Sequence, residues 1–349
     1  MTRLFVLHRF VAALAGLALL SGASGAAAQG VGSGAAQSGV PIESRDVRAW
    51  LMRIHQAARE RSFQGTFVVS GPGGVASARI AHYWQSPNQY ERIESLDGQA
   101  RVVFRQNDIV HTVWPKGRVV VIEQRNSPMS FPALLQTGDD QIADLYELRQ
   151  LGVERVAGHE ASVLLVKPRD AMRYGYRLWS ERQSGLLLRA EVLGMQDETL
   201  ETSAFSDVTI GVKPQPEIVL QGMRRPDGYR VLRPVMATTT LDSEGWSLRP
   251  TAPGFQAISC VRRPLDDPRA PEATLLEGQV LQTIYSDGLT HVSIFIEPYD
   301  PQRHTRPMLV SVGATQTLMR RHADWWITAV GDVPSATLRS FVGALERKK

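Results

Sequence analysis

The chain of 349 residues contains one cysteine, Cys260, and only five lysines beside 34 arginines. A single thiol excludes a disulfide within the chain, so the fold depends on its core, and a chain of this length buries enough surface for that. The formal net charge of +4 is too small to indicate binding of nucleic acid. The excess of arginine reflects either the base composition of the genome or a use for guanidinium groups, which bind carboxylates and phosphates.

The motifs of common enzyme classes are missing as well. His159-Glu160 lacks the second histidine of a zinc-protease helix, and Gly71-Pro72-Gly73-Gly74 has a proline where a phosphate-binding loop needs backbone N–H groups. There is no G-x-S-x-G nucleophile elbow. His82 and His111 lie in predicted strands and leave a metal site across a sheet as an alternative. We therefore expect a protein that is not an enzyme, without a catalytic residue, a metal or a cofactor.

Long apolar runs are absent beyond the N-terminus, where the chain begins with the pattern of an export signal. Arg3 and Arg9 form a short positive region before an apolar run from Phe10 to Leu20, which is too short to span a bilayer and is followed by Ala26-Ala27-Ala28. This pattern predicts a signal peptide over residues 1–28 and export of the remainder. Residues 29–43 are rich in Gly, Ala, Ser and Gln and are expected to form a flexible lead-in.

The next part of the chain, residues 44–212, is predicted to be a β domain opened by a helix. The apolar positions after Ser44 recur at helical spacing: Val47, Trp50, Leu51, Ile54 and Ala58. From Gln64 to Ile210 the period changes to two, with turn signals such as Asp97-Gly98 and Ser184-Gly185. A further helix is predicted around Asp139 to Arg149. Roughly ten strands predict a curved sheet or an incomplete barrel with helices on one face.

A proline-rich linker over residues 213–240 is predicted to lead to a smaller second domain, residues 241–349. The linker contains one short helical stretch, Pro216 to Met223. Five strands follow in the pattern of the second domain: 255–261, 280–285, 291–297, 309–320 and 325–330. A terminal helix opens at Pro334-Ser335, and its apolar stripe is Leu338, Phe341, Val342 and Leu345.

Apolar side chains in the strands of the first domain supply a candidate cavity. In a sandwich such residues would interdigitate with a second sheet, whereas in a single curled sheet part of the face can stay open for an acyl chain or an apolar peptide. The pattern leaves both arrangements open. The candidate cavity residues are Phe67, Val69, Ile80, Val103, Val113, Val121, Leu164, Leu178 and Leu187.

Several short motifs stand in order along nearly the whole predicted mature chain: FQGTF at 63–67, RYGYRLW at 173–179, SGLLLR at 184–189, YSDGL at 285–289, VSIFIE at 292–297 and VGDVP at 330–334. Together they resemble the MucB/RseB family of periplasmic regulators of an envelope-stress sigma factor. The resemblance implies a protein that is mainly β with some α. Its N-terminal domain would be an unclosed antiparallel barrel like that of the lipoprotein carriers, with helices plugging it, and its C-terminal domain a smaller β/α unit.

The resemblance also implies a location, partners and a function. Such proteins bind, in the periplasm, the periplasmic domain of a single-span anti-sigma factor and shield it from regulated proteolysis. Lipid, lipopolysaccharide or lipoprotein acyl chains then loosen the complex during envelope stress. We assign most of the partner contact to the C-terminal domain, with four aromatic candidates that are alternatively core residues: Tyr285, Phe295, Trp325 and Trp326.

Two other functions stay open at this point, and a homo-oligomer is also possible. The main alternative is a soluble periplasmic carrier of lipids or lipoproteins, against which the second domain argues because the carriers need only the first. The third is a hydrolase of envelope components, for which the sequence offers no nucleophile with a base partner.

Overall fold

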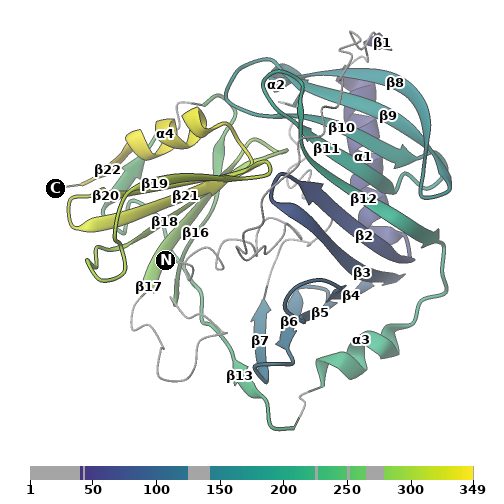
Figure 1. Cartoon of the computed structure of the whole chain (residues 1–349), viewed down its shortest axis with the longest axis horizontal. Coiled ribbons are helices and arrows are strands. Elements are labelled where there is room, and N and C mark those ends of the chain that lie inside the picture. The colour runs from purple at the N-terminus through teal and green to yellow at the C-terminus, as the bar shows by residue number, and fades with distance from the viewer. Residues whose placement is uncertain are drawn as a thin grey trace, which may run out of the picture.

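The computed structural model describes residues 40–41, 44–124, 142–224, 227–249, 252–264 and 279–348. The predicted signal peptide and nearly all of the predicted lead-in lie outside these residues. Two sheets of 13 and seven strands form two domains that lie side by side (Figure 1). Within the described residues, no helix is long and apolar enough to cross a membrane.

The N-terminal domain is one open sheet, antiparallel except for its last pair, β7 with β13, and α1 (Ser44–Glu60) packs against it. The strand order is β1-β8-β9-β10-β11-β12-β2-β3-β4-β5-β6-β7-β13, and the two outer strands do not pair with each other. The predicted unclosed barrel is therefore confirmed. The strands are β1 (Val40–Pro41), β2 (Phe63–Gly71), β3 (Gly74–Gln85), β4 (Asn88–Ser95), β5 (Val102–Gln106), β6 (Ile109–Trp114), β7 (Val119–Gln124), β8 (Tyr146–Val156), β9 (His159–Pro168), β10 (Gly175–Glu181), β11 (Leu187–Leu193), β12 (Thr199–Ile210) and β13 (Arg230–Leu232).

Helix α1 forms because its apolar residues recur on one face, and that face is buried on the sheet. Leu51 and Ile54 are 2% and 3% exposed and pack with side chains of β8 to β11, whereas Met52 points to solvent. The predicted helix and its apolar face are confirmed at these positions.

The segment predicted to be a linker is attached to the N-terminal sheet. Helix α3 (Pro216–Met223) buries Val219 against Tyr83 and Tyr90, and β13 pairs in parallel with β7. Figure 1 shows α3 and β13 along the lower edge of the N-terminal domain. These contacts tie residues 216–232 to the first domain and leave a short connection before the second.

Two glycines in helices provide a matched test of this packing. An added Cβ on Gly222 of α3 would lie 2.0 Å from the ring of Phe104, whereas nothing lies within 4 Å of one on Gly343. We expect Gly222→Ala to lower the free energy of unfolding by about 1–3 kcal/mol because the ring or the helix must shift. Gly343→Ala should raise it by about 0.5–1 kcal/mol through helix propensity. Urea unfolding of both variants measures the two changes in the free energy of unfolding. Equal stabilisation by both would contradict the close packing of α3 on Phe104.

The C-terminal domain is a seven-stranded sheet covered on one face by α4 (Ser335–Gly343). Its strand order is β14-β16-β17-β18-β21-β20-β19, and β15 pairs separately with β22. The helix buries Leu338 and Phe341 in a core with Ile294, Ile296 and Ile327. The strands are β14 (Ala237–Thr238), β15 (Trp246–Leu248), β16 (Gln256–Pro264), β17 (Gln279–Ser286), β18 (His291–Pro298), β19 (Met308–Val312), β20 (Thr315–His322), β21 (Trp325–Gly331) and β22 (Leu345–Arg347).

Four details differ from the sequence predictions. Of the helix predicted around Asp139 to Arg149, the described residues from Ile142 onward form the single turn α2 (Ile142–Leu145) and then strand β8, which was missed. The single strand predicted over 309–320 is the hairpin β19–β20, which turns at Gly313 with a positive φ of 59°. The terminal helix ends before Leu345, which belongs to β22. The end of the predicted flexible lead-in forms β1, paired with β8.

Candidate functional site

The face of the N-terminal sheet on which α1 packs, here called the inner face, holds eight of the nine predicted cavity residues. Residues directly opposite each other in a ladder point to the same side of a sheet. Leu164 pairs with Leu178, and the ladders continue from Leu178 through Ala190 and Ser203 to Val69. From β2 the inner face continues along a second set of pairs: Gly65–Ile80, Ile80–Ile93, Ile93–Val103, Val103–Thr112 and Thr112–Val121.

Val113 is the exception among the nine. It pairs with Val102 and Val120, which lie on the opposite face from Val103 and Val121. His111 faces the same way as Val113, whereas His82 is on the inner face opposite Phe63. The alternative of a metal site shared by His82 and His111 is therefore wrong. Within the described residues, no group of His, Cys, Asp and Glu side chains has the geometry of a metal site.

The eight inner-face residues belong to three hydrophobic clusters, each with different packing partners. Leu164, Leu178 and Leu187 pack with Leu51 and Ile54 of α1. An acyl chain would reach this part of the face only if α1 moved. A second cluster consists mainly of strand residues, among them Phe63 and Phe205, whose rings meet edge-on. The predicted cavity residues in this cluster are Phe67, Val69, Ile80 and Val103. Val121 belongs to a small third cluster with Trp114 and Val119.

Three ionisable side chains interrupt the inner face; sequence analysis considered His82 only as a metal ligand and missed the other two. His82, Glu91 and Arg105 are opposite one another on β3, β4 and β5 and are 1%, 8% and 4% exposed. Glu91 lies 3.9 Å from His82 Nε2 and 3.8 Å from Arg105 Nη1, which are ion-pair distances too long for hydrogen bonds. Each residue stands two positions from an apolar inner-face residue, so the strand period itself was the available signal.

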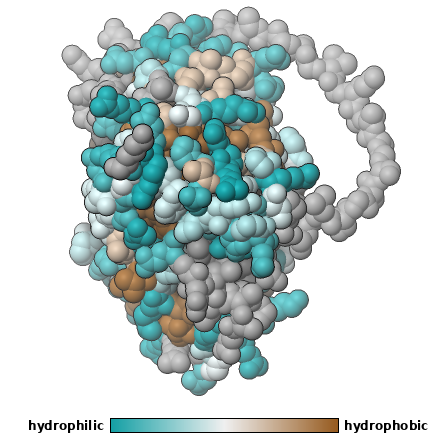
Figure 2. Space-filling model, turned by 90° about the vertical axis from the view of Figure 1, so that its left-hand side faces the viewer, coloured by the Kyte–Doolittle hydropathy of each residue, from teal (hydrophilic) through white to brown (hydrophobic). Residues whose placement is uncertain are grey.

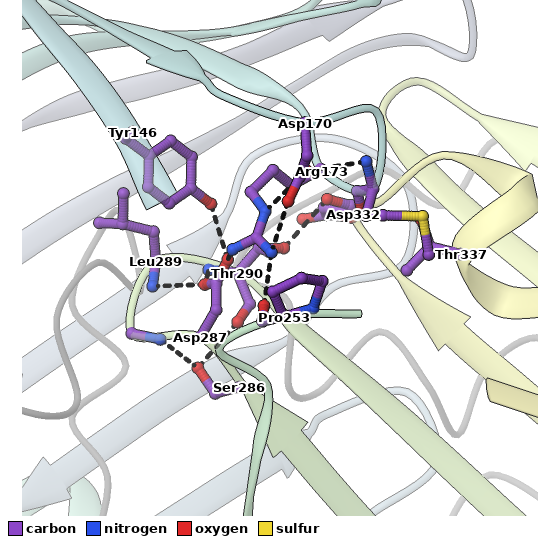
Figure 3. Close-up of polar contacts among 12 residues, drawn as sticks. Tyr146, Asp170, Arg173, Pro253, Ser286, Asp287, Leu289, Thr290, Asp332 and Thr337 are labelled. Carbon is purple, nitrogen blue, oxygen red and sulfur yellow. Dashed lines mark hydrogen bonds and ion pairs between the residues drawn. The ribbon is translucent and has the colours of Figure 1, made fainter. Parts of the chain in front are cut away.

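A buried ion pair joins the two domains (Figure 3). Arg173, from the loop between β9 and β10, donates from Nη1 to Asp287 Oδ2 at 2.5 Å, and both side chains are fully buried. Tyr146 of β8 donates to the same oxygen at 2.8 Å. Arg173 also donates from Nη2 to the Pro253 carbonyl at 2.6 Å and from Nε to Asp170 at 3.1 Å. The guanidinium group therefore binds both domains at once, and we call this network the junction.

The sequence around Asp287 positions its carboxylate for this role. Its second oxygen accepts the backbone N–H groups of Leu289 and Thr290, both at 2.9 Å, which fixes the turn between β17 and β18. Burial raises the pKa of Tyr146 well above its ordinary value, and the neighbouring Asp287 adds to this, so the phenol stays a donor. Thr337 of α4 donates to the Met172 carbonyl at 2.7 Å as a further bond between the domains.

His291, which interacts electrostatically with Asp287 of the junction, predicts that the stability of the fold depends on pH. Burial lowers the pKa of His291, against the opposing effect of Asp332 and Asp287. The unfolded chain, with a histidine pKa of about 6.5, then binds protons more readily than the folded chain, so stability falls as the pH drops below about 6.5. His291→Asn should reduce this slope. Part of it should remain because burial also lowers the pKa of His55 and His111. Urea unfolding between about pH 5 and 7.5 tests this, and an unchanged slope would contradict it.

The four aromatic anchors predicted in the C-terminal domain are largely interior. Tyr285 is 4% exposed and packs its ring on Phe341, 5.5 Å between centroids, which makes it a core residue in this structure. Trp325 is half-buried and packs edge-on against Trp246. Phe295 and Trp326 lie on the sheet face opposite α4 and are also buried. None of the four is an exposed anchor. Figure 2, which views the molecule from the C-terminal domain's side, shows apolar residues in separate patches among hydrophilic ones.

Comparison with known proteins accounts for both domains. Residues 46–223 match the MucB/RseB N-terminal domain, and residues 240–346 match the MucB/RseB C-terminal domain. The chain belongs to the MucB/RseB family. The family consists of regulatory binding proteins, which confirms the prediction that this member is not an enzyme.

Relatives of this MucB/RseB family member match over most of their length. The chain is 30% identical to the sigma factor AlgU regulatory protein MucB of Pseudomonas aeruginosa, over 84% of this chain and 89% of that protein. It is 24% identical to the sigma-E factor regulatory protein RseB of Escherichia coli K12, over 83% and 87%. Among solved structures, a P. aeruginosa MucA/MucB complex matches with a TM-score of 0.65 at 28% identity, covering 87% of this chain and 99% of that one. MucB in complex with MucA(peri) matches with a TM-score of 0.63 at 26% identity, over 88% and 100%.

Proposed function

We propose that this chain is a periplasmic regulator that binds the periplasmic segment of an anti-sigma factor, shields it from regulated proteolysis, and releases it when lipid or lipopolysaccharide binds. The observation that carries the proposal is the likeness, through both domains, to MucB in structures of its complex with MucA. A lipid carrier without a protein partner would not need the C-terminal domain.

Contacts between the inner face and the junction support a coupling between lipid and partner. Leu289 of the C-terminal domain packs in the same cluster as Leu164, Leu178 and the α1 residue Leu51. It lies two residues from Asp287, whose carboxylate holds Arg173. A hydrocarbon chain that entered this cluster would displace Leu289 and strain the junction. The lipid would then shift the domain arrangement by its difference in affinity for the two arrangements.

The proposal is tested by binding and by protection from proteolysis. The periplasmic segment of a single-span anti-sigma factor from the same organism is titrated with the full mature chain and then exposed to the site-one protease. We expect a saturable 1:1 complex that slows cleavage, and faster cleavage after addition of lipopolysaccharide. Absence of a complex would overturn the proposal. Lipid binding without a complex would favour the carrier instead.

The location is tested separately. A tagged copy expressed with its N-terminus intact should be recovered in the periplasmic fraction and should lose residues 1–28, as mass spectrometry of the purified protein would show. Recovery of the uncleaved chain in the cytoplasm would contradict the periplasmic assignment.

A further inference from the structure

The outer strand of the C-terminal sheet, β19, is an unprotected edge. Among the described residues the other outer strands are short, with two residues in β1 and β14 and three in β13. β19 has five residues in unbroken register with β20, from Met308–Met319 to Val312–Thr315. Natural edges are usually shortened, bulged or marked with charge because their free N–H and C=O groups pair with other chains. β19 contains no charged residue, proline or bulge.

At the opposite edge of the same sheet, strand β16 shows what a protected edge looks like. β14 covers it at only two positions, but the register of β16 with β17 shifts between Ala257 and Ser259. Such a bulge twists an edge away from a regular partner. β19 lacks this device, which makes it the edge of this sheet suited to adding a strand.

The side chains of β19 indicate the chemistry of an added strand. Leu309 is 38% exposed and Ser311 is also exposed, so one side of the edge offers alternating apolar and small polar contacts. Arg306 precedes the strand and Arg320 lies on β20 beside Met319, the partner of Met308. Both arginines are exposed, and no ion pair to either is found in the described part of the chain. This end of the edge therefore suits acidic residues.

The far end of β19 limits the size of its occupant. An added Cβ on Gly73, in the turn between β2 and β3, would lie 2.7 Å from Val312, and one on Gly313 would lie 2.6 Å from Glu201 of β12. The N-terminal domain thus stands against this end of the strand. An extended segment fits beside such an edge, whereas a second folded copy would meet the first copy's N-terminal domain.

We propose that β19 binds an extended segment of the anti-sigma partner by strand addition, with acidic residues of that segment at the Arg306 and Arg320 end. The inference rests on the proposed function and assigns a surface to it. Main-chain hydrogen bonds along the edge provide affinity, and alternate side chains of the segment contact Leu309 and Ser311. None of the aromatic residues predicted from sequence is needed for this contact.

Two proline variants test the strand addition, and they are made as a pair because one of them is expected to keep the native fold. Successive N–H groups of a strand point to opposite sides, so only one of Leu309→Pro and Val310→Pro removes a bond to β20. The other removes an outward donor and should keep the unfolding midpoint. We expect the variant that keeps its midpoint to bind the periplasmic anti-sigma segment about tenfold or more weakly by calorimetry. Amides of residues 308–312 in the unmutated chain should gain protection from hydrogen exchange in the complex.

Charge reversal tests the orientation. Arg306→Glu with Arg320→Glu should slow association by about tenfold or more at low salt, an effect that shrinks as salt rises. Arg79→Glu with Arg155→Glu, at two exposed arginines of the N-terminal domain, changes the net charge equally and is the matched control, which should leave association nearly unchanged.

The outcomes separate this inference from the proposed function. No binding of the segment by the unmutated chain would overturn both. Binding that survives the folded proline variant, with no protection of β19, would overturn the strand addition alone. A concentration-dependent dimer of the free chain that the folded proline variant abolishes, with partner binding intact, would assign the edge to a second copy and likewise overturn it.

Discussion

Replacing Arg173 with methionine is expected to lower the free energy of unfolding by about 3–5 kcal/mol, because it leaves the Asp287 carboxylate buried without its counter-charge. Methionine keeps the aliphatic stem of the arginine and removes only the guanidinium group, whose Cζ lies 5.5 Å from the ring centroid of Tyr146 and 5.3 Å from that of Phe255. The loss should therefore come mainly from the charge rather than from a cavity. Urea unfolding gives the free energy, and small-angle scattering should show a larger radius of gyration as the two domains separate.

The exposed pair Arg182–Glu160 is the matched control, with side chains 54% and 71% exposed. Arg182→Met should change the free energy of unfolding by less than about 1 kcal/mol. Adding Asp287→Asn to the Arg173→Met variant should cost much less than Asp287→Asn alone, since the charge to be paired is already lost. Equal losses for Arg173→Met and Arg182→Met would show that the junction does not hold the domains.

Leu289→Ala is expected to cost about 2–5 kcal/mol of stability and to change the response to lipid. Leu289 is 5% exposed and is the C-terminal domain's contribution to the cluster that contains Leu164 and Leu178. Because alanine leaves most of the space of the Leu289 side chain empty, a hydrocarbon chain can enter the cluster without displacing it. Lipid should bind the variant more tightly than the unmutated chain and loosen the partner complex less. Fluorescent fatty-acid binding and the partner titration measure the two effects.

Leu96→Ala provides the control for this experiment, because Leu96 is 43% exposed. Its stability should stay within about 0.5 kcal/mol of the unmutated chain, and its lipid response should be unchanged. A Leu289→Ala variant with an unaltered lipid response would remove Leu289 from the coupling and leave it a packing residue only.

The periodicity of apolar residues was sufficient to predict helices and strands whose buried face is evident within one short segment of the sequence. The stripe of Leu338, Phe341 and Val342 specified α4, and the alternation around Phe67 and Val69 specified an inward-facing strand. Strand β8 was missed because charged residues such as Glu147 and Arg149 conceal the inward residues Tyr146 and Leu148. The orientation of Val113 was missed because a shift of one residue reverses a strand's faces.

The junction was beyond the reach of such patterns. Arg173 and Asp287 are 114 residues apart, and each stands in a polar stretch that reads as an exposed turn. Leu345 shows the same limit, since it continues the apolar stripe of α4 yet pairs with Leu248 of β15. Contacts between distant segments override local propensity in both cases, so only the folded arrangement reveals them.

A complete binding cycle is the most direct test of the central claim that lipid and anti-sigma segment act on one another through the inner face and the junction. The dissociation constant of the segment is measured with and without saturating lipopolysaccharide, and that of lipopolysaccharide with and without saturating segment. We predict that each ligand weakens the other by the same factor, on the order of 5–150-fold, and that Leu289→Ala reduces this factor. If lipopolysaccharide and the segment bind together with unchanged affinities, the coupling does not exist.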